Sequence, residues 1–145
     1  MHRFALVAAA LAACLIAQPA AAQTRSGPDS MTLIWKSWGN RLVEWTVPRG
    51  GEARYINREG ETVAFPVTPE QFDAFRAVFA PYEGVPFRCQ RAISDGAYGS
   101  VIWTGAGGAE ESLNFDAGCV TGDADDVFRR LEQAEAMLKA WRDAR

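Results

Sequence analysis

The stretch that decides the fold reads MTLIWKSWGNRLVEWTV, residues 31–47. Two runs rich in β-branched and aromatic residues flank Gly39 and Asn40, a pattern typical of a β-hairpin with a two-residue turn. We therefore expect an antiparallel hairpin of residues 31–38 and 41–47. If Trp38 pairs with Arg41, one face of the hairpin carries Ile34, Val43, Trp45 and Val47, and the other carries Leu33, Trp35, Leu42 and Glu44.

The hairpin continues into further strands and then a helix. Gly50 with Gly51, and Glu59 with Gly60, mark turns that bound two more strands, at 52–58 and 61–67. Thr68, Pro69 and Gln71 then form a helix start, because threonine can cap, proline suits the first helical position and glutamine completes a capping box. Aromatic residues at helical spacing follow until Pro81, which ends the helix.

The second half repeats the order of strands followed by a helix. We expect strands at 87–93, 100–104 and 110–116, and a helix from 123 to 141 whose apolar stripe repeats every three or four residues. The chain is therefore predicted to be an α+β protein. Its antiparallel sheet has six to seven short strands, two helices pack on one face, and one disulfide is present.

The N-terminus predicts export. Residues 1–22 have a short basic start, an apolar run and an Ala-x-Ala ending, which together are typical of a secretory signal peptide. Residues 23–30 are expected to be a flexible lead-in, and residues 31–145 a single domain. Within this run, residues 11–14 (Leu-Ala-Ala-Cys) also fit a lipoprotein signal, in which Cys14 receives the lipid. The alternative to a secreted or periplasmic protein is therefore a lipid-anchored form. We expect no transmembrane segment after cleavage.

Removal of residues 1–22 changes the composition. The remaining 123 residues have a net charge of −4 and contain no histidine. A mildly acidic chain without a basic tract is a poor nucleic-acid binder. Without histidine, Ser-His and Cys-His catalysis and His-ligated metal sites are excluded. We expect no cofactor, no metal and no catalytic residues.

Two cysteines, Cys89 and Cys119, remain after cleavage. In an oxidising compartment they are expected to form a disulfide, which stabilises the fold by roughly 3–4 kcal/mol for a loop of this length. A simple meander of residues 87–116 would leave Cys119 far from Cys89. The chain at 116–118 must therefore turn back, or the last strand must pair elsewhere.

Aromatic residues are the candidate binding residues. Trp35, placed beside Glu44 with Tyr55 nearby, and Trp38 at the turn could form a partly exposed patch that suits a protein or a sugar. Tyr98 lies in a glycine-rich loop that would make a contact tip. The alternative is that these rings belong to the core, the reading we favour for the other tryptophans, Trp45, Trp103 and Trp141.

Acidic residues offer the alternative function. Asp95, Glu110, Glu111 and Asp116 lie near one expected sheet edge, and paired carboxylates could serve a hydrolase. The acidic run at 123–126 is explained by capping of the last helix rather than by calcium.

We therefore expect a small secreted or periplasmic module without enzymatic activity, which binds an envelope protein or a glycan. The alternative is a small hydrolase that depends on carboxylates. The sequence does not predict the oligomeric state.

Overall fold

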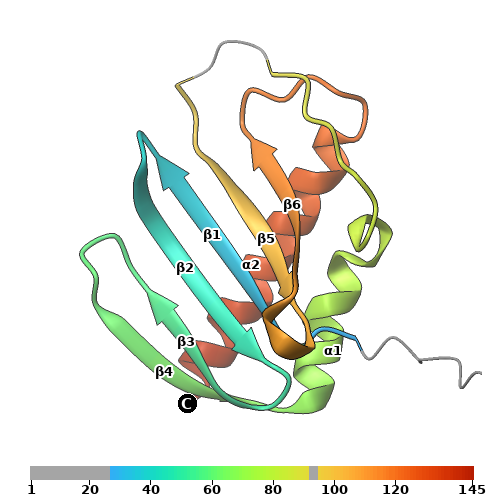
Figure 1. The fold of residues 1–145 in the computed structure, drawn as a ribbon. Coiled ribbons are helices and arrows are strands. Elements are labelled where there is room, and N and C mark those ends of the chain that lie inside the picture. The colour runs from blue at the N-terminus through green and yellow to red at the C-terminus, as the bar shows by residue number, and fades with distance from the viewer. Residues whose placement is uncertain (1–26, 92–94) are drawn as a thin grey trace, which may run out of the picture.

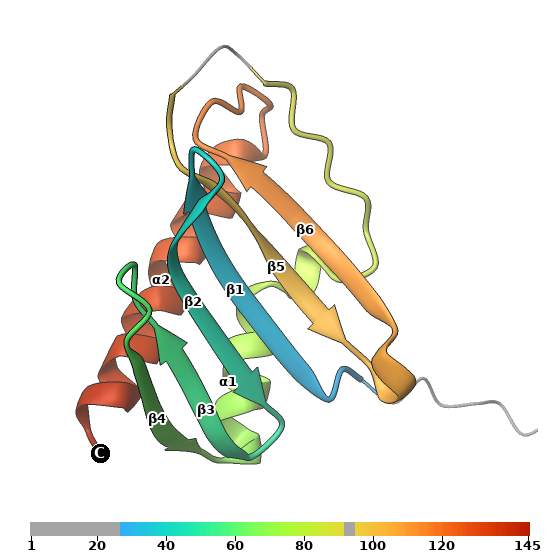
Figure 2. The same ribbon diagram turned by 60° about the vertical axis from the view of Figure 1, so that its left-hand side comes forward.

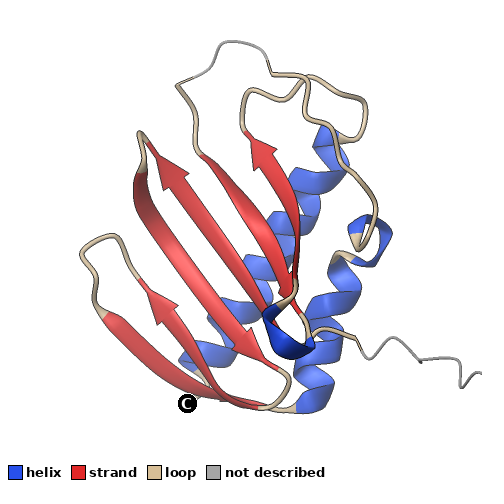
Figure 3. Cartoon of the chain, in the orientation of Figure 1, coloured by secondary structure: helices blue, strands red, loops and turns tan. Residues whose placement is uncertain are grey.

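Six strands form one antiparallel sheet in the order β4-β3-β2-β1-β5-β6 (Figures 1 and 3). The computed structural model describes residues 27–91 and 95–145. The first half holds β1 (Ser30–Ser37), β2 (Asn40–Pro48), β3 (Gly51–Ile56), β4 (Thr62–Val67) and helix α1 (Pro69–Val78), followed by the short 3-10 turn η1 (Ala80–Tyr82). The second half holds β5 (Tyr98–Thr104), the 3-10 turn η2 (Ala106–Gly108), β6 (Glu110–Asp116) and helix α2 (Ala124–Asp143).

Both helices lie on the same face of the sheet, and the described residues leave the other face uncovered (Figure 2). The core lies between the helices and the face of the sheet that they cover, since residues along the strands alternate between buried and less buried positions. Its largest fully buried side chains are Trp45, Phe65, Phe72, Phe75, Phe79, Met31, Leu33, Leu113, Leu131 and Leu138, together with two valines. The predicted α+β fold with an antiparallel sheet and two helices on one face is confirmed.

The predicted register of the first hairpin is wrong by one residue. Trp38 and Gly39 form the turn, so that Ile34 pairs with Glu44 and Leu33 with Trp45. Because a one-residue slip moves every side chain to the opposite face, β1 turns Met31, Leu33 and Trp35 toward the helices instead of Ile34. This set is more apolar than Thr32, Ile34 and Lys36, which explains why the observed register is the favourable one.

The start of α1 follows the sequence pattern. The Thr68 hydroxyl accepts a hydrogen bond from the Gln71 N–H at 3.2 Å, and the Gln71 side chain accepts one from the Thr68 N–H at 2.8 Å. This is the predicted capping box. At the start of α2, Asp123 occupies the N-cap position, but its side chain makes no capping hydrogen bond.

The predicted strand at 87–93 is wrong in its described part. Residues 87–90 form no strand, and Arg91 makes only an isolated bridge to Cys119. The disulfide between Cys89 and Cys119 is present, with the two Cα atoms 5.3 Å apart. The chain turns back after β6, which was one of the two expected solutions. The Cys119 N–H donates to the Asp116 carbonyl within this turn, and the Val120 N–H donates to the Gln90 carbonyl of the segment that carries Cys89.

Part of the N-terminal predictions lies outside the described residues. This is true of the signal peptide at 1–22, of Cys14 and of the first residues of the lead-in at 23–30. In the rest of the lead-in, Pro28 is buried and the Asp29 N–H donates to the Thr104 carbonyl at 2.8 Å. No helix in the described parts of the chain is long and apolar enough to cross a membrane.

Candidate functional site

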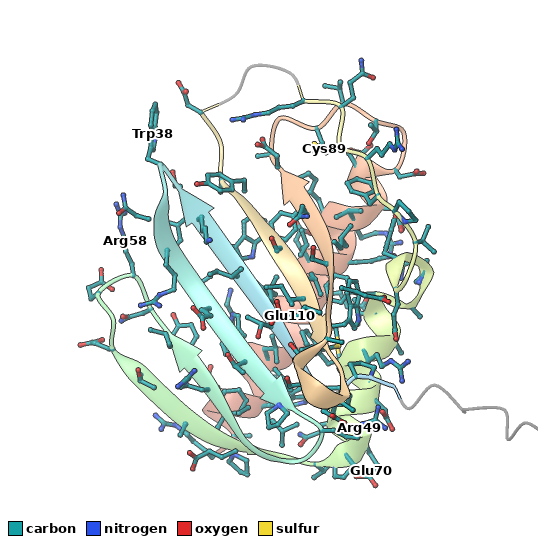
Figure 4. The ribbon with its side chains drawn as sticks, in the orientation of Figure 1. Trp38, Arg49, Arg58, Glu70, Cys89 and Glu110 are labelled. Atoms are coloured by element: carbon teal, nitrogen blue, oxygen red, sulfur yellow. A yellow bond between two sulfur atoms is a disulfide. The ribbon has the colours of Figure 1, made fainter. Side chains whose placement is uncertain are left out.

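Trp38 stands at the tip of the first hairpin with 78% of its surface exposed. It projects away from the sheet (Figure 4). Its φ is 49° and that of Gly39 is 79°, so both turn residues adopt positive φ. Two-residue turns of this kind match the twist of paired strands, but they favour asparagine, aspartate or glycine. The turn requires positive φ at this position, but neither packing nor the turn explains why a bulky, exposed tryptophan occupies it.

Tyr98, at the start of β5, lies beside this turn. Its hydroxyl accepts a hydrogen bond from the Gly39 N–H at 3.0 Å. The pairing of Lys36 with Tyr98 brings the two segments together, because β1 lies between β2 and β5 in the sheet. Trp38 and Tyr98, two of the three predicted binding residues, are thus neighbours in the fold.

Arg91 and Asp95 complete a shallow hollow of about 130 Å³ with these two aromatic residues. We call Trp38, Arg91, Asp95 and Tyr98 the tip cluster. Arg91 is held by an ion pair from its Nε to the Asp116 carboxylate at 3.0 Å, and most of its side chain is still exposed. The Asp116 carboxylate also accepts a hydrogen bond from the Gly118 N–H at 2.8 Å. The ion pair therefore fixes Arg91 at the hollow that the two aromatic residues line.

Sequence reasoning did not identify Arg91. It follows Cys89 by two residues, and the disulfide brings this segment beside the end of β6. The spacing of the two cysteines was the available signal. The spacing indicated that the segment around Cys89 meets the chain after β6. It did not indicate which side chain of this segment would line the hollow with Tyr98.

Trp35 does not join the tip cluster. Its ring packs edge-on against Phe115, with centroids 4.6 Å apart, and lies 6.4 Å from Phe128 on α2. Tyr55 likewise lies on the helix side, 4.3 Å from Trp45. Glu44 lies on the opposite face and pairs with Arg41. The predicted surface patch of Trp35, Glu44 and Tyr55 is therefore wrong, because it depended on the incorrect hairpin register.

The remaining tryptophans pack as expected for core residues. Trp45 and Trp103 are only 1% and 4% exposed, and Trp141 is partly buried against the core.

The four acidic residues considered for hydrolysis lie at two ends of the sheet. Asp95 and Asp116 lie at the end that carries Tyr98, whereas Glu110 and Glu111 lie at the start of β6. Because β6 runs from Glu110 to Asp116, roughly 20 Å of extended strand separates the two groups. A carboxylate of one group therefore cannot face a carboxylate of the other across a single active site.

The acidic run at 123–126 has a structural role at Asp126. Its carboxylate accepts hydrogen bonds from the Tyr82 hydroxyl at 2.9 Å, from Arg130 at 2.6 Å and from Arg129. The hydrogen bond from Arg130, with smaller contributions from Tyr82 and Arg129, lowers the pKa of Asp126 to about 2. This side chain links α2 to η1.

Comparisons with protein-family models, with curated proteins and with solved structures find no match to this chain.

Proposed function

We propose that this protein is a non-enzymatic module, exported to the periplasm or the extracellular space, that binds an envelope protein through the tip cluster. The observation that carries the proposal is Trp38, a bulky side chain held at positive φ with 78% of its surface exposed. Backbone strain of this kind is concentrated at functional sites, because elsewhere it only destabilises the fold.

The composition of the tip cluster supports a protein as the partner. Tryptophan, tyrosine and arginine are the residue types most enriched among the few side chains that dominate protein–protein binding energy. Trp38, Tyr98 and Arg91 represent all three. A ring that projects from a hairpin tip suits insertion into a pocket of a protein partner.

Export rests on residues 1–22, and the intact mass of the exported protein separates a start at Gln23 from lipid on Cys14. The alternative function, a hydrolase that depends on carboxylates, is not favoured, since the four acidic residues named for it are divided between two ends of the sheet.

The test compares capture from an envelope extract by the wild-type domain and by Trp38→Asn, under oxidising conditions. Asparagine suits the positive φ, so the variant folds and is expected to be more stable to urea by about 0.5–1 kcal/mol. We expect the wild type to retain a specific protein and Trp38→Asn to lose it. Val120→Ala is the matched control, because Val120 is 63% exposed and lies outside the tip cluster.

Two results would contradict the proposal. One is equal capture of the same protein by the wild type and Trp38→Asn. The other is cosedimentation with purified envelope glycan that depends on Trp38, which would make the ligand a sugar instead of a protein.

A further inference from the structure

A cleft opens at the other end of β5 and β6, between the end of α1 and the hairpin that contains η2. It consists of two adjoining hollows of about 490 Å³ and 250 Å³, which share Gly84, Trp103 and Glu111. The larger hollow is within the size range of small-molecule sites, roughly 300–1,000 Å³. Residues of the tip cluster line neither hollow, so this cleft is a separate site.

Glu111 occupies an unusual position in this cleft. It pairs across the strands with Trp103, whose side chain faces the helices, so Glu111 lies on the same helix-facing side of β6. The later residues on this side of β6, Leu113 and Phe115, are buried core residues. Glu111 is exposed. The helix-facing side of β6 therefore has a carboxylate at the cleft, next to apolar residues that are buried in the core.

One charged side chain of the cleft has no partner. Among its described lining residues, the charged side chains are Arg76, Glu83 and Glu111. Arg76 donates two hydrogen bonds to Glu83, at 2.8 and 2.7 Å, so these two charges neutralise each other. The carboxylate of Glu111 has no ion-pair or hydrogen-bond partner among the residues that the structure describes. It is therefore an unpaired anion at the place where the two hollows meet.

Apolar groups line the part of the cleft next to this carboxylate. Val85, which is 54% exposed, lines the smaller hollow with Pro86 and Tyr82. Trp103 forms part of the wall of both hollows. If Gly84 carried a Cβ atom, this atom would lie 3.6 Å from a carboxylate oxygen of Glu111. The backbone at Gly84 therefore passes close to the charge. The site thus combines one unpaired carboxylate with the apolar wall of the smaller hollow.

We propose that this cleft binds a guanidinium or ammonium group carried on a short aliphatic chain. The cationic head pairs with Glu111 in a charge-assisted hydrogen bond, and the aliphatic chain packs against Val85, Pro86 and Trp103. An anionic ligand would meet the carboxylate of Glu111, and Arg76 already directs Nε and one of its Nη atoms to Glu83.

The test is a titration of the isotope-labelled domain with n-butylguanidinium and n-butylammonium, followed by amide chemical shifts. We expect saturable shifts at Gly84, Trp103 and Glu111 with both cations, and none with n-butanol, which has the same chain without the charge. Glu111→Gln is expected to weaken binding about tenfold, since it removes the charge-assisted bond and keeps the side-chain size.

Glu110→Gln is the matched control. It removes the same charge from the neighbouring residue of β6, whose side chain points to the opposite face of the sheet. We expect it to bind both cations like the wild type, and Trp38→Asn to do so as well, which separates this site from the tip cluster. The proposal is overturned if neither cation causes saturable shifts, if Glu111→Gln binds like the wild type, or if n-butanol shifts the same residues equally.

Discussion

Trp38 shows how one residue can conflict with its local structure. The turn between β1 and β2 needs positive φ at two positions, and Gly39 meets this need without cost. Trp38 meets it at a steric cost of roughly 1–2 kcal/mol, because its Cβ crowds the carbonyl oxygen. The hydrogen bonds from Gly39 to Tyr98 and from Asn40 to the Trp38 carbonyl help to hold this conformation.

Asp126 is the residue whose environment has the clearest consequence for stability. Its carboxylate meets Arg130, Tyr82 and Arg129, and Arg130 also donates to the Val78 carbonyl at the end of α1 at 2.6 Å. These contacts favour the charged form, and so the pKa of Asp126 falls from 3.8 to about 2 in the folded protein.

This pKa shift predicts a defined pH dependence. A carboxyl group with a lowered folded pKa stabilises the fold above its ordinary pKa, and this contribution is lost as the pH falls from 3.8 to about 2. We expect Asp126→Asn to unfold at lower urea concentration than the wild type at pH 7, with the gap closing over that pH interval. Urea midpoints from pH 7 to 2 measure it. Asp125→Asn, on the same turn of α2, serves as control, and a gap independent of pH would refute the prediction.

At the scale of elements, the contact between β1 and β5 depends on Gly99. It pairs with Trp35 in the sheet and with Phe115 on β6. A Cβ at this position would clash with the Ile34 carbonyl oxygen and would lie 2.7 Å from the Phe115 ring. The missing side chain therefore lets the strands approach and leaves room for the Trp35 ring to pack against Phe115.

Gly99→Ala is expected to destabilise the protein by about 3 kcal/mol, because the added methyl group has no space and the backbone of β1 must move. Chemical denaturation measures the loss, and amide shifts of β1 and β5 show where the strain falls. Gly105→Ala is the matched control. Its added Cβ would make only ordinary contact, at 3.7 Å, and should cost far less. Equal losses for the two variants would refute the packing argument.

At the scale of the whole molecule, the disulfide holds the long connection between α1 and β5. This connection forms no strand in its described part, and it meets the rest of the chain at Arg91 and Cys119 and through the hydrogen bond from Val120 to Gln90. Figure 4 shows Cys89 at the same end of the molecule as Trp38. The covalent link therefore also fixes the position of the segment that supplies Arg91 to the tip cluster.

Loss of this disulfide is expected to cost about 3–4 kcal/mol, since the bond closes a loop with a sequence separation of 30 residues. Cys119→Ser and the double variant with Cys89→Ser should lose the same amount, because either change removes the whole bond. Urea unfolding of both variants against the oxidised wild type measures it. A loss below about 1 kcal/mol would show that the bond does not constrain the unfolded chain as supposed.

The sequence predicted those elements whose signals are local. The capping box at Thr68 and the bounds of β6 at Glu110 and Asp116 follow the pattern of residues closely. The structure of residues 87–91 could not be predicted in the same way. Their composition suits a strand, and only the surrounding chain decides whether a partner strand is available. The candidate site was predicted in part, since Trp38 and Tyr98 were named but their proximity was not.

By itself, the sequence determined the class of fold, the pairing of Cys89 with Cys119 and the absence of histidine after residue 22. Periodicity and composition are local properties and need no knowledge of distant contacts. Only the tertiary structure decided the register of the first hairpin, the packing of Trp35 against Phe115 and the separation of the tip cluster from the cleft at Glu111. These depend on contacts between residues far apart in the chain, where a shift of one residue exchanges the two faces of a strand.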